Sequence, residues 1–188
     1  MSKKNIFTKS ALSLLLLAGI STSAVQASDV KYNYIEGRYI LDAETDNNVD
    51  GDGFQLGGSF RINNDFYVIG SYQTLDLDFN NDIDTLKIGA GYILPINGQW
   101  DANFSLSLVN RDVNSNDDNG FSASAGVRGM LTPKIEGRAA VNYIDVNDSD
   151  TFITLGADYF VLRNLSVGVE ADLSGDLDTV SIGARYYF

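Results

Sequence analysis

The sequence of 188 residues contains no cysteine and no histidine, and only two prolines. Without cysteine there is no disulfide, no thiolate metal site and no lipid attached at a cysteine. Without histidine, the Ser–His and Cys–His nucleophiles and histidine-based metal sites are excluded. Two carboxylates can also act as acid and base, but no pair stands out among the many acids. We therefore expect that the protein is not an enzyme.

Basic residues are scarce, with 13 Lys and Arg against 25 Asp and Glu. Three of the lysines precede an apolar run at 11–20, and a small residue, Ala27, follows at the distance of a cleavage site. This pattern predicts a cleaved secretory signal over residues 1–27, because the run is shorter than the roughly 20 apolar residues of a membrane-spanning helix. The mature chain, 28–188, then has 10 basic and 25 acidic residues, a net charge of −15. Such a chain repels nucleic acid and favours cations.

Helical periodicity is also missing, because no window of ten or more residues in the mature chain keeps a 3.6-residue apolar repeat. Apolar and polar residues alternate instead. Each alternating segment is close to the roughly 9–11 residues that a tilted strand needs to cross a bilayer. Ten segments have this pattern: 35–41, 54–62, 66–74, 85–94, 100–108, 121–131, 135–143, 152–161, 165–173 and 180–188.

The connections between these segments are of two kinds. Four are tight and contain Asn, Pro or Gly, as hairpin turns do: 63–65, 95–98, 132–134 and 162–164. Five are longer and acidic: 42–52, 76–84, 112–118, 145–150 and 172–178. Short turns at one end and longer loops at the other are typical of outer-membrane barrels. Both termini then lie at the short-turn end, which we expect to be periplasmic.

Alternation alone also fits a soluble barrel of lipocalin type, whose apolar face points inward. Two features favour the membrane. No charged residue falls on the apolar face, where a charge at mid-membrane costs about 2–4 kcal/mol. Aromatic residues on that face gather near strand ends, as interfacial belts do. Near the long loops they are Tyr39, Phe54, Tyr72, Phe121 and Tyr143; near the short turns they are Phe60, Phe66, Tyr92, Trp100, Tyr159, Tyr186 and Phe188.

A closed barrel is the sheet that leaves no unpaired backbone edge in lipid. The sequence therefore predicts an all-β fold, a closed antiparallel up-and-down transmembrane β-barrel of ten strands over 28–188. A barrel of eight strands is the alternative.

The opposite face carries charges of both signs. The tetrapeptide IEGR, at 35–38 and again at 135–138, twice places a Glu and an Arg on it. A paired ion-binding site is one interpretation. The other, which we favour, is mutual neutralisation in a narrow lumen, because breaking a buried pair costs roughly 3–5 kcal/mol. Hairpin neighbours suggest the pairs Glu136–Arg128, Arg138–Asp158 and Glu170–Arg185. The predicted network comprises Glu36, Arg38, Arg61, Arg128, Glu136, Arg138, Asp158, Glu170 and Arg185.

The remaining acids concentrate in the five long connections, which contain no Lys or Arg. One interpretation of this acidic rim is a solvated surface; the other is screening by Ca²⁺ or Mg²⁺. Residues 46–51 match the first half of a calcium loop, so Asp46, Asn48 and Asp50 are candidate ligands. The closing Glu is missing, since Gly57 occupies that position. We expect no other cofactor.

The segment YNYIEGRYI (32–40) and the terminal RYYF (185–188) carry a family resemblance. The mature chain resembles the small outer-membrane β-barrel proteins of Gram-negative bacteria, broadly the OmpA- and OmpX-like barrels. It is most similar to a group of xanthomonad outer-membrane proteins of this size. The resemblance implies that Phe188, a final outward aromatic, is presented to the barrel-assembly machinery. OmpA- and OmpX-like barrels have eight strands, so their detailed geometry does not transfer to ten.

We therefore expect a monomeric, multi-pass protein of the bacterial outer membrane. Its partners would be membrane lipid and lipopolysaccharide, with no nucleic acid. A structural or surface-interaction role, carried by the acidic loops, is the expected function. The alternative is a narrow, porin-like channel that prefers cations, because ten strands enclose a wider lumen than eight.

Overall fold

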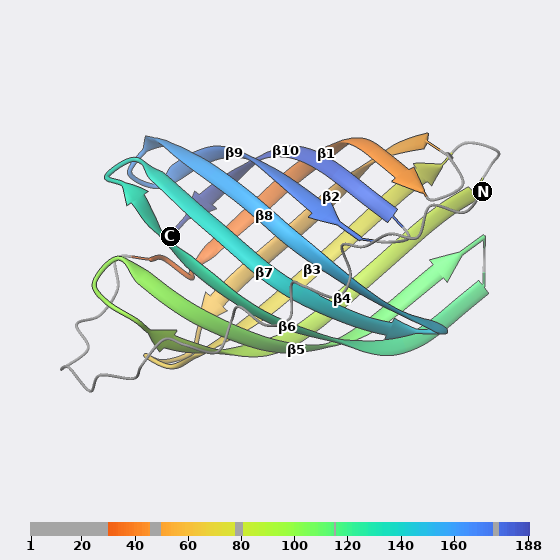
Figure 1. Cartoon of the computed structure of the whole chain (residues 1–188), viewed down its shortest axis with the longest axis horizontal. Helices are drawn as coiled ribbons and strands as arrows, with labels where there is room; N and C mark the ends of the chain where they lie inside the picture. Colours follow the sequence, from red (N-terminus) through yellow and green to blue (C-terminus); the bar gives the residue numbers. More distant parts are fainter. Residues whose placement is uncertain (1–29, 46–49, 78–80, 115, 175–176) are drawn as a thin grey trace, which may run out of the picture.

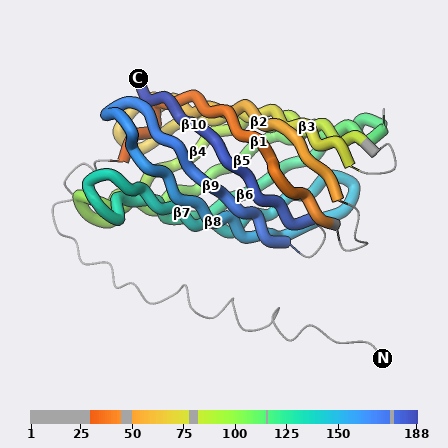
Figure 2. Tube along the Cα trace, turned by 90° about the horizontal axis from the view of Figure 1, so that it is seen from above, coloured from red at the N-terminus to blue at the C-terminus, as the bar shows by residue number. Residues whose placement is uncertain are grey.

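Ten strands form one closed barrel in the computed structural model, which describes residues 30–188 except 46–49, 78–80, 115 and 175–176. Each strand pairs antiparallel with its neighbours along the chain, and β10 closes the sheet onto β1 (Figures 1 and 2). The strands are β1 Tyr34–Thr45, β2 Asp50–Arg61, β3 Phe66–Leu77, β4 Asn81–Pro95, β5 Trp100–Val113, β6 Asn116–Thr132, β7 Ile135–Val146, β8 Asp148–Leu162, β9 Leu165–Leu173 and β10 Leu177–Tyr187. The prediction of ten strands is confirmed, and the eight-stranded alternative is wrong. No helix in the described part of the chain has the length and hydropathy to cross a bilayer.

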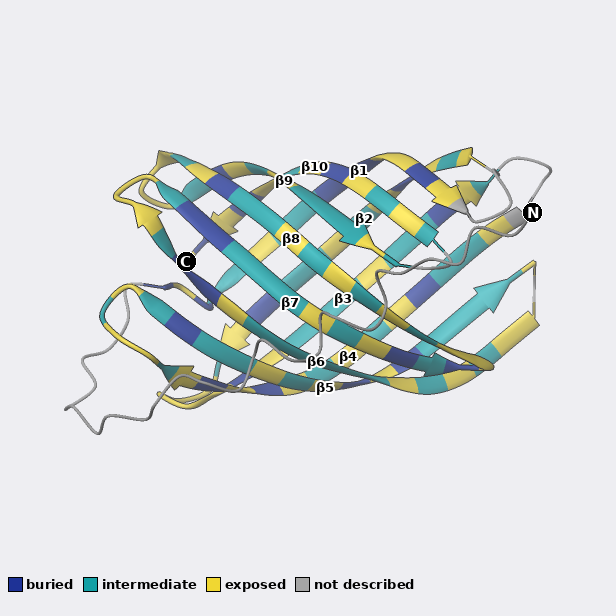
Figure 3. Cartoon of the chain, viewed as in Figure 1, coloured by how far each residue is buried: buried dark blue, intermediate teal, exposed yellow. Residues whose placement is uncertain are grey.

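The apolar face of the sheet points outward and the charged face points into the barrel, the reverse of the arrangement in a soluble barrel. Along each strand, exposed residues alternate with buried or half-buried ones (Figure 3). Leu106 and Leu108 point outward and are 66% and 76% exposed, whereas the inward Arg38 and Glu136 are 2% and 1% exposed. A lipocalin-type barrel would show the reverse, so the apolar outer face identifies the surface that meets lipid.

Asparagine side chains hold two of the tight turns. The Asn63 Oδ1 atom accepts hydrogen bonds from the backbone N–H groups of Asp65 and Phe66, both at 2.9 Å. Asn97 repeats this arrangement with Gln99 at 2.8 Å and Trp100 at 3.0 Å. Such side-chain bonds replace a backbone turn and explain why Asn occupies both positions.

The other end of the barrel differs from the predicted long loops. Most residues expected there extend the strands: β1 reaches Thr45 and β2 starts at Asp50, while β7 ends at Val146 and β8 starts at Asp148. The single residue between β7 and β8, Asn147, has φ of 66°, a left-handed conformation that asparagine tolerates better than most residues. The acidic rim is therefore built largely from paired strand ends.

A β-bulge in β1 keeps two acids out of the lumen. The pairing of β1 with both neighbours shifts register just after Ile40. Ile40 and Ala43 both become buried, while Asp42 and Glu44 are exposed. Without the extra residue, strict alternation would place both carboxylates on the same face as Ile40. The bulge thus re-aims these side chains, as bulges near barrel rims commonly do.

Outward tyrosines mark the boundary between the apolar band and the acidic strand ends. The Tyr39 hydroxyl donates to Asp52 at 2.5 Å, and that of Tyr72 donates to Asp84 at 2.9 Å. Each ring lies on the exposed apolar face while its hydroxyl reaches an acid. This is the amphipathic placement expected of an aromatic belt at a membrane interface.

Candidate functional site in the barrel lumen

A network of ion pairs fills the lumen near the short-turn end. It begins with the bidentate pair of Arg128 and Glu136, whose two contacts measure 2.6 and 3.1 Å. Both residues are buried, and the tight β6–β7 turn brings them together, as the sequence predicts. Glu136 also accepts a 3.5 Å bond from Arg185 on β10, which links the hairpin to the far side of the sheet.

Arg138 joins two acids on different strands. It pairs with Asp158, the predicted partner, and with Glu170 at 2.7 Å. Glycine makes the second contact accessible, because Gly156 lies between Arg138 and Glu170 in the register. A Cβ atom on Gly156 would come within 2.7 Å of the guanidinium carbon of Arg138. The missing side chain on β8 lets Arg138 reach across that strand.

The predicted pair of Glu170 and Arg185 does not form. In the β9–β10 register, Arg185 faces Ser166 and Glu170 faces Ser181, so the two side chains are offset along the strands. Arg185 instead contacts Glu36 at 2.8 Å, across the seam where β10 meets β1. Sequence spacing misses this contact because its partners are 149 positions apart.

Arg38 connects the two halves of the network. Its guanidinium group lies 3.2 Å from Glu36, 3.8 Å from Asp158 and 3.6 Å from Glu170. The two IEGR tetrapeptides therefore contribute to one continuous network. It contains eight of the nine predicted side chains.

Arg61 is the exception. Within the described residues it forms no salt bridge, and its guanidinium lies 5.3 Å from the ring centroid of Tyr32 instead. Arg128 lies over the same ring at 5.2 Å. Such contacts replace a carboxylate with an aromatic face. Among the described residues, Arg61 therefore lies beside the lumenal charge network without an ion pair that joins it to the other eight side chains.

The segment before β1 packs inside the barrel, which the sequence analysis missed. Val30 and Tyr32 are 3% and 4% exposed and form a small apolar cluster with Tyr67 and Ile93. The neighbouring cavity has a volume of only about 160 Å³. Tyr32 lies outside the ten alternating segments, but the alternation of Tyr32 and Tyr34 just before β1 was an available signal.

The half of the lumen near the acidic strand ends contains more free volume and is partly apolar. Ile40, Ala43 and Leu75 form one buried cluster there, and Val109, Ile144 and Val146 form another. A cavity of about 400 Å³ lies in this half and is lined by both basic and acidic side chains, including Lys87, Arg111, Asp150 and Asp172. Inward apolar positions on the strand extensions could have been found by continuing the alternation beyond the predicted segments.

The candidate calcium ligands are only partly covered by the structure. Asp46 and Asn48 lie outside the described residues, and Asp50 is the exposed first residue of β2. Among the described side chains, no group of three or more His, Cys, Asp or Glu residues is arranged to hold a metal ion.

Phe188, the proposed assembly signal, lies at the short-turn end. Its side chain is 63% exposed, and its backbone N–H donates to the Asn33 carbonyl oxygen at 3.1 Å. Ile182 and Tyr186 are exposed on the same outer face. The final aromatic therefore continues the outward row of β10.

Comparison with known proteins adds a family and a set of similar folds. The family model described as outer membrane protein beta-barrel domain matches residues 12–188. The KdgM porin in complex with disordered oligogalacturonate is similar in fold, with a TM-score of 0.53 and 8% identity over 82% of this chain and 99% of the porin. An outer-membrane channel from Pseudomonas putida F1 has a TM-score of 0.53 and 9% identity, covering 90% of this chain and all of that one. No curated protein sequence matches the chain.

Proposed function

Because the chain belongs to the outer membrane protein β-barrel domain family, we propose that it is a non-conducting barrel with a structural or surface-interaction role. The observation that supports this role is the filled lumen near the short turns. There Arg38, Glu136 and Arg185 are each at most 3% exposed, and Tyr32 packs beside them. In this proposal the acidic strand ends face the outside of the cell, and both termini face the periplasm.

The rival function is a narrow channel that prefers cations. The similar folds include a porin and a channel, but identities of 8% and 9% carry the fold alone. For conduction, ions would have to pass the region around Arg128 and Arg185, where the neighbouring cavity is about 160 Å³. The arginines there would oppose cations. We therefore favour the surface role.

Conductance in planar bilayers separates these functions. We expect no discrete current steps from the wild-type protein at high salt. A matched variant, Arg128→Ser with Glu136→Ser, keeps the net charge and removes the bidentate pair, so any current should be larger than in the wild type. Stable, cation-selective steps from the wild type would contradict the proposed role and support the channel.

Deletion of Phe188 tests the proposed contact with the barrel-assembly machinery. We expect less folded protein in the outer membrane, with export to the periplasm unchanged, because the outward terminal aromatic is lost. The folded fraction can be measured by heat-modified mobility on gels. Phe188→Tyr keeps an aromatic ring and serves as the control. A normal yield of the deletion variant would refute the assembly role.

Divalent cations should stabilise the acidic rim, where we propose that they screen the strand ends together with lipopolysaccharide phosphates. Exposed acids there, such as Asp52 and Asp76, repel one another over a screening length of about 8 Å at physiological salt. We expect millimolar Ca²⁺ or Mg²⁺ to raise the unfolding temperature in detergent more than NaCl at equal ionic strength.

A defined calcium site gives a different pattern. It would prefer Ca²⁺ over Mg²⁺, and its stabilisation would disappear in the variant Asp46→Asn with Asp50→Asn. Diffuse screening would be similar for both ions and only partly reduced by that variant. If NaCl produces the same shift as either divalent cation, the rim is a solvated surface and both cation proposals fail.

A further inference from the structure

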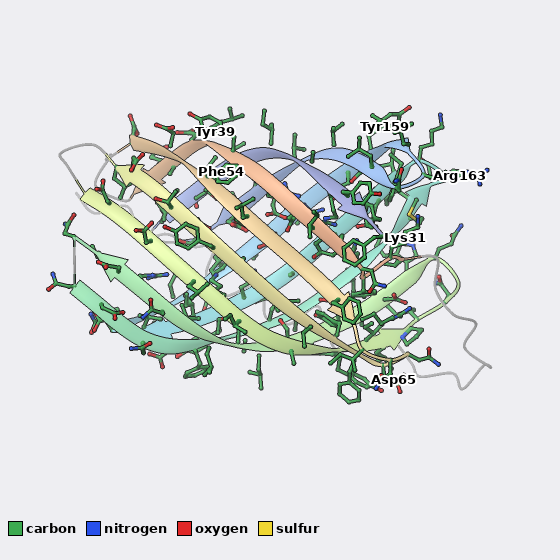
Figure 4. All side chains as sticks on the ribbon, turned by 180° about the vertical axis from the view of Figure 1, so that it is seen from behind. Lys31, Tyr39, Phe54, Asp65, Tyr159 and Arg163 are labelled. Carbon is green, nitrogen blue, oxygen red and sulfur yellow. The ribbon has the colours of Figure 1, made fainter. Side chains whose placement is uncertain are left out.

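The basic residues outside the lumen converge on a single pocket. Seven of the ten bases in residues 28–188 point inward, and the other three are Lys31, Lys134 and Arg163. All three line one cavity of about 720 Å³ at the short-turn end, formed by the segment before β1, the β6–β7 turn and the β8–β9 turn. In Figure 4, Lys31 and Arg163 lie at one end of the barrel, near Tyr159, while Tyr39 and Phe54 lie toward the other.

Hydrogen bonds to backbone carbonyl oxygens join the segments that carry these bases. The Lys31 ammonium donates to the Arg163 carbonyl oxygen at 2.7 Å and lies 5.6 Å from the ring centroid of Tyr187. The Phe160 N–H donates to the Lys134 carbonyl oxygen at 2.8 Å, which ties the two turns together. The three positively charged side chains are thus held near one another by the fold.

No carboxylate lines this pocket, and within the described residues none of its three bases forms a salt bridge. Three neighbouring like charges repel one another unless an anion joins them. The arrangement contrasts with the lumen, where most of the arginines have acidic partners. It therefore indicates a site for an anion from outside the chain.

Apart from Gln99 and Thr132, the other walls of the pocket are apolar, and they lie at the membrane boundary. Val161 and Leu162 line it and are 46% and 61% exposed, and Met130 and Phe160 also contribute. The outward Tyr159 lies two residues before Val161 and belongs to the aromatic row at this end. The polar headgroup of a ligand bound here would contact the basic side chains. Its hydrocarbon tail would contact the exposed apolar side chains of the protein.

We propose that the pocket of Lys31, Lys134 and Arg163 binds the phosphate of an anionic phospholipid in the leaflet at the short-turn end. The acyl chains of this lipid lie along Val161 and Leu162. Clustered Lys and Arg side chains beside a membrane attract anionic headgroups, and the apolar wall distinguishes a lipid from a free anion. The site is independent of whether the lumen conducts.

Native mass spectrometry of the refolded protein can test the site. Phosphatidylglycerol and phosphatidylcholine with the same acyl chains are titrated separately, and we expect the wild type to retain phosphatidylglycerol preferentially. The variant Lys134→Gln with Arg163→Gln leaves the Lys31 contacts intact and should weaken this binding by about 30-fold. Adding Lys31→Gln should bring the loss to about 100-fold.

A relocated-charge variant controls for net charge. Asn64→Lys with Asp65→Lys, added to the triple variant, restores the wild-type net charge at the exposed β2–β3 turn of the same barrel end. We expect it not to restore phosphatidylglycerol binding. Recovery of binding, equal retention of both lipids by the wild type, or undiminished binding by the triple variant would each overturn the proposal. Displacement of the lipid by millimolar inorganic phosphate would assign the site to a free anion instead.

Discussion

Replacement of Glu136 by alanine is expected to destabilise the folded barrel by about 3–5 kcal/mol, the cost of breaking a buried ion pair. Glu136 is 1% exposed and is the bidentate partner of Arg128. It also accepts a hydrogen bond from Arg185. Its loss leaves two buried guanidinium groups with fewer acids, so the penalty comes mainly from the uncompensated charges.

Chemical unfolding of the refolded protein in detergent measures this effect. The matched control is Asp148→Ala, which removes an exposed acid at the first position of β8 and should change stability little. The double variant, Glu136→Ala with Arg128→Ala, should recover part of the lost unfolding free energy. The recovery is incomplete because Arg185 still loses its contact with Glu136. Small and equal effects in all three variants would show that water screens the lumenal charges, and would favour the channel.

Replacement of Gly168 by alanine is expected to cost about 1–3 kcal/mol, the usual range for overpacking a filled interior. A Cβ atom there would come within 2.5 Å of the Ala157 carbonyl oxygen and would also meet the Asp158 carboxylate. Neither neighbour can move easily, because the first is backbone in the β8–β9 ladder. The second is 1% exposed and is held by arginines.

Gly98 provides the control for this substitution. It lies in the β4–β5 turn, where an added Cβ atom has no neighbour within 4 Å and φ is not positive. Gly98→Ala should therefore be neutral or stabilise the protein by about 0.4–1 kcal/mol through the unfolded chain. The unfolding free energies of both variants, measured in the same detergent, give the comparison. If Gly168→Ala is as stable as Gly98→Ala, the lumen has free space beside Asp158.

Period-two alternation predicts the number of strands and their faces within the apolar band, because successive side chains of a strand point to opposite sides of the sheet. It does not predict how far the strands extend beyond that band. Arg128 and Glu136 were paired correctly because a tight turn fixes their register. Glu170 was paired wrongly, since its true neighbour depends on Gly156 and on offsets between three strands. A contact such as Arg185 with Glu36 requires closure of the sheet, which local spacing does not encode.

The sequence predicts loops in the acidic segments because Asp, Asn and Gly are depleted in strands. Pairing with neighbouring strands overrides that preference here, as at Asp76, which lies opposite both Asp52 and Asp82. The bulge after Ile40 leaves no periodic signal, so the structure alone reveals it. The inward position of Tyr32 continues the alternation of Tyr32 and Tyr34 and could have been found by extending the first segment toward the N-terminus.

The seam between β1 and β10 sets an order of events for the folding chain. Arg128 and Glu136 are eight positions apart and can meet as soon as one hairpin forms. Glu36 and Arg185 are 149 positions apart and can meet only when the first and last strands join. Contacts made after the rate-limiting step contribute little to the speed of assembly and mainly slow unfolding. If the seam closes after that step, the Glu36–Arg185 pair lowers the unfolding rate of the closed barrel and leaves the folding rate almost unchanged.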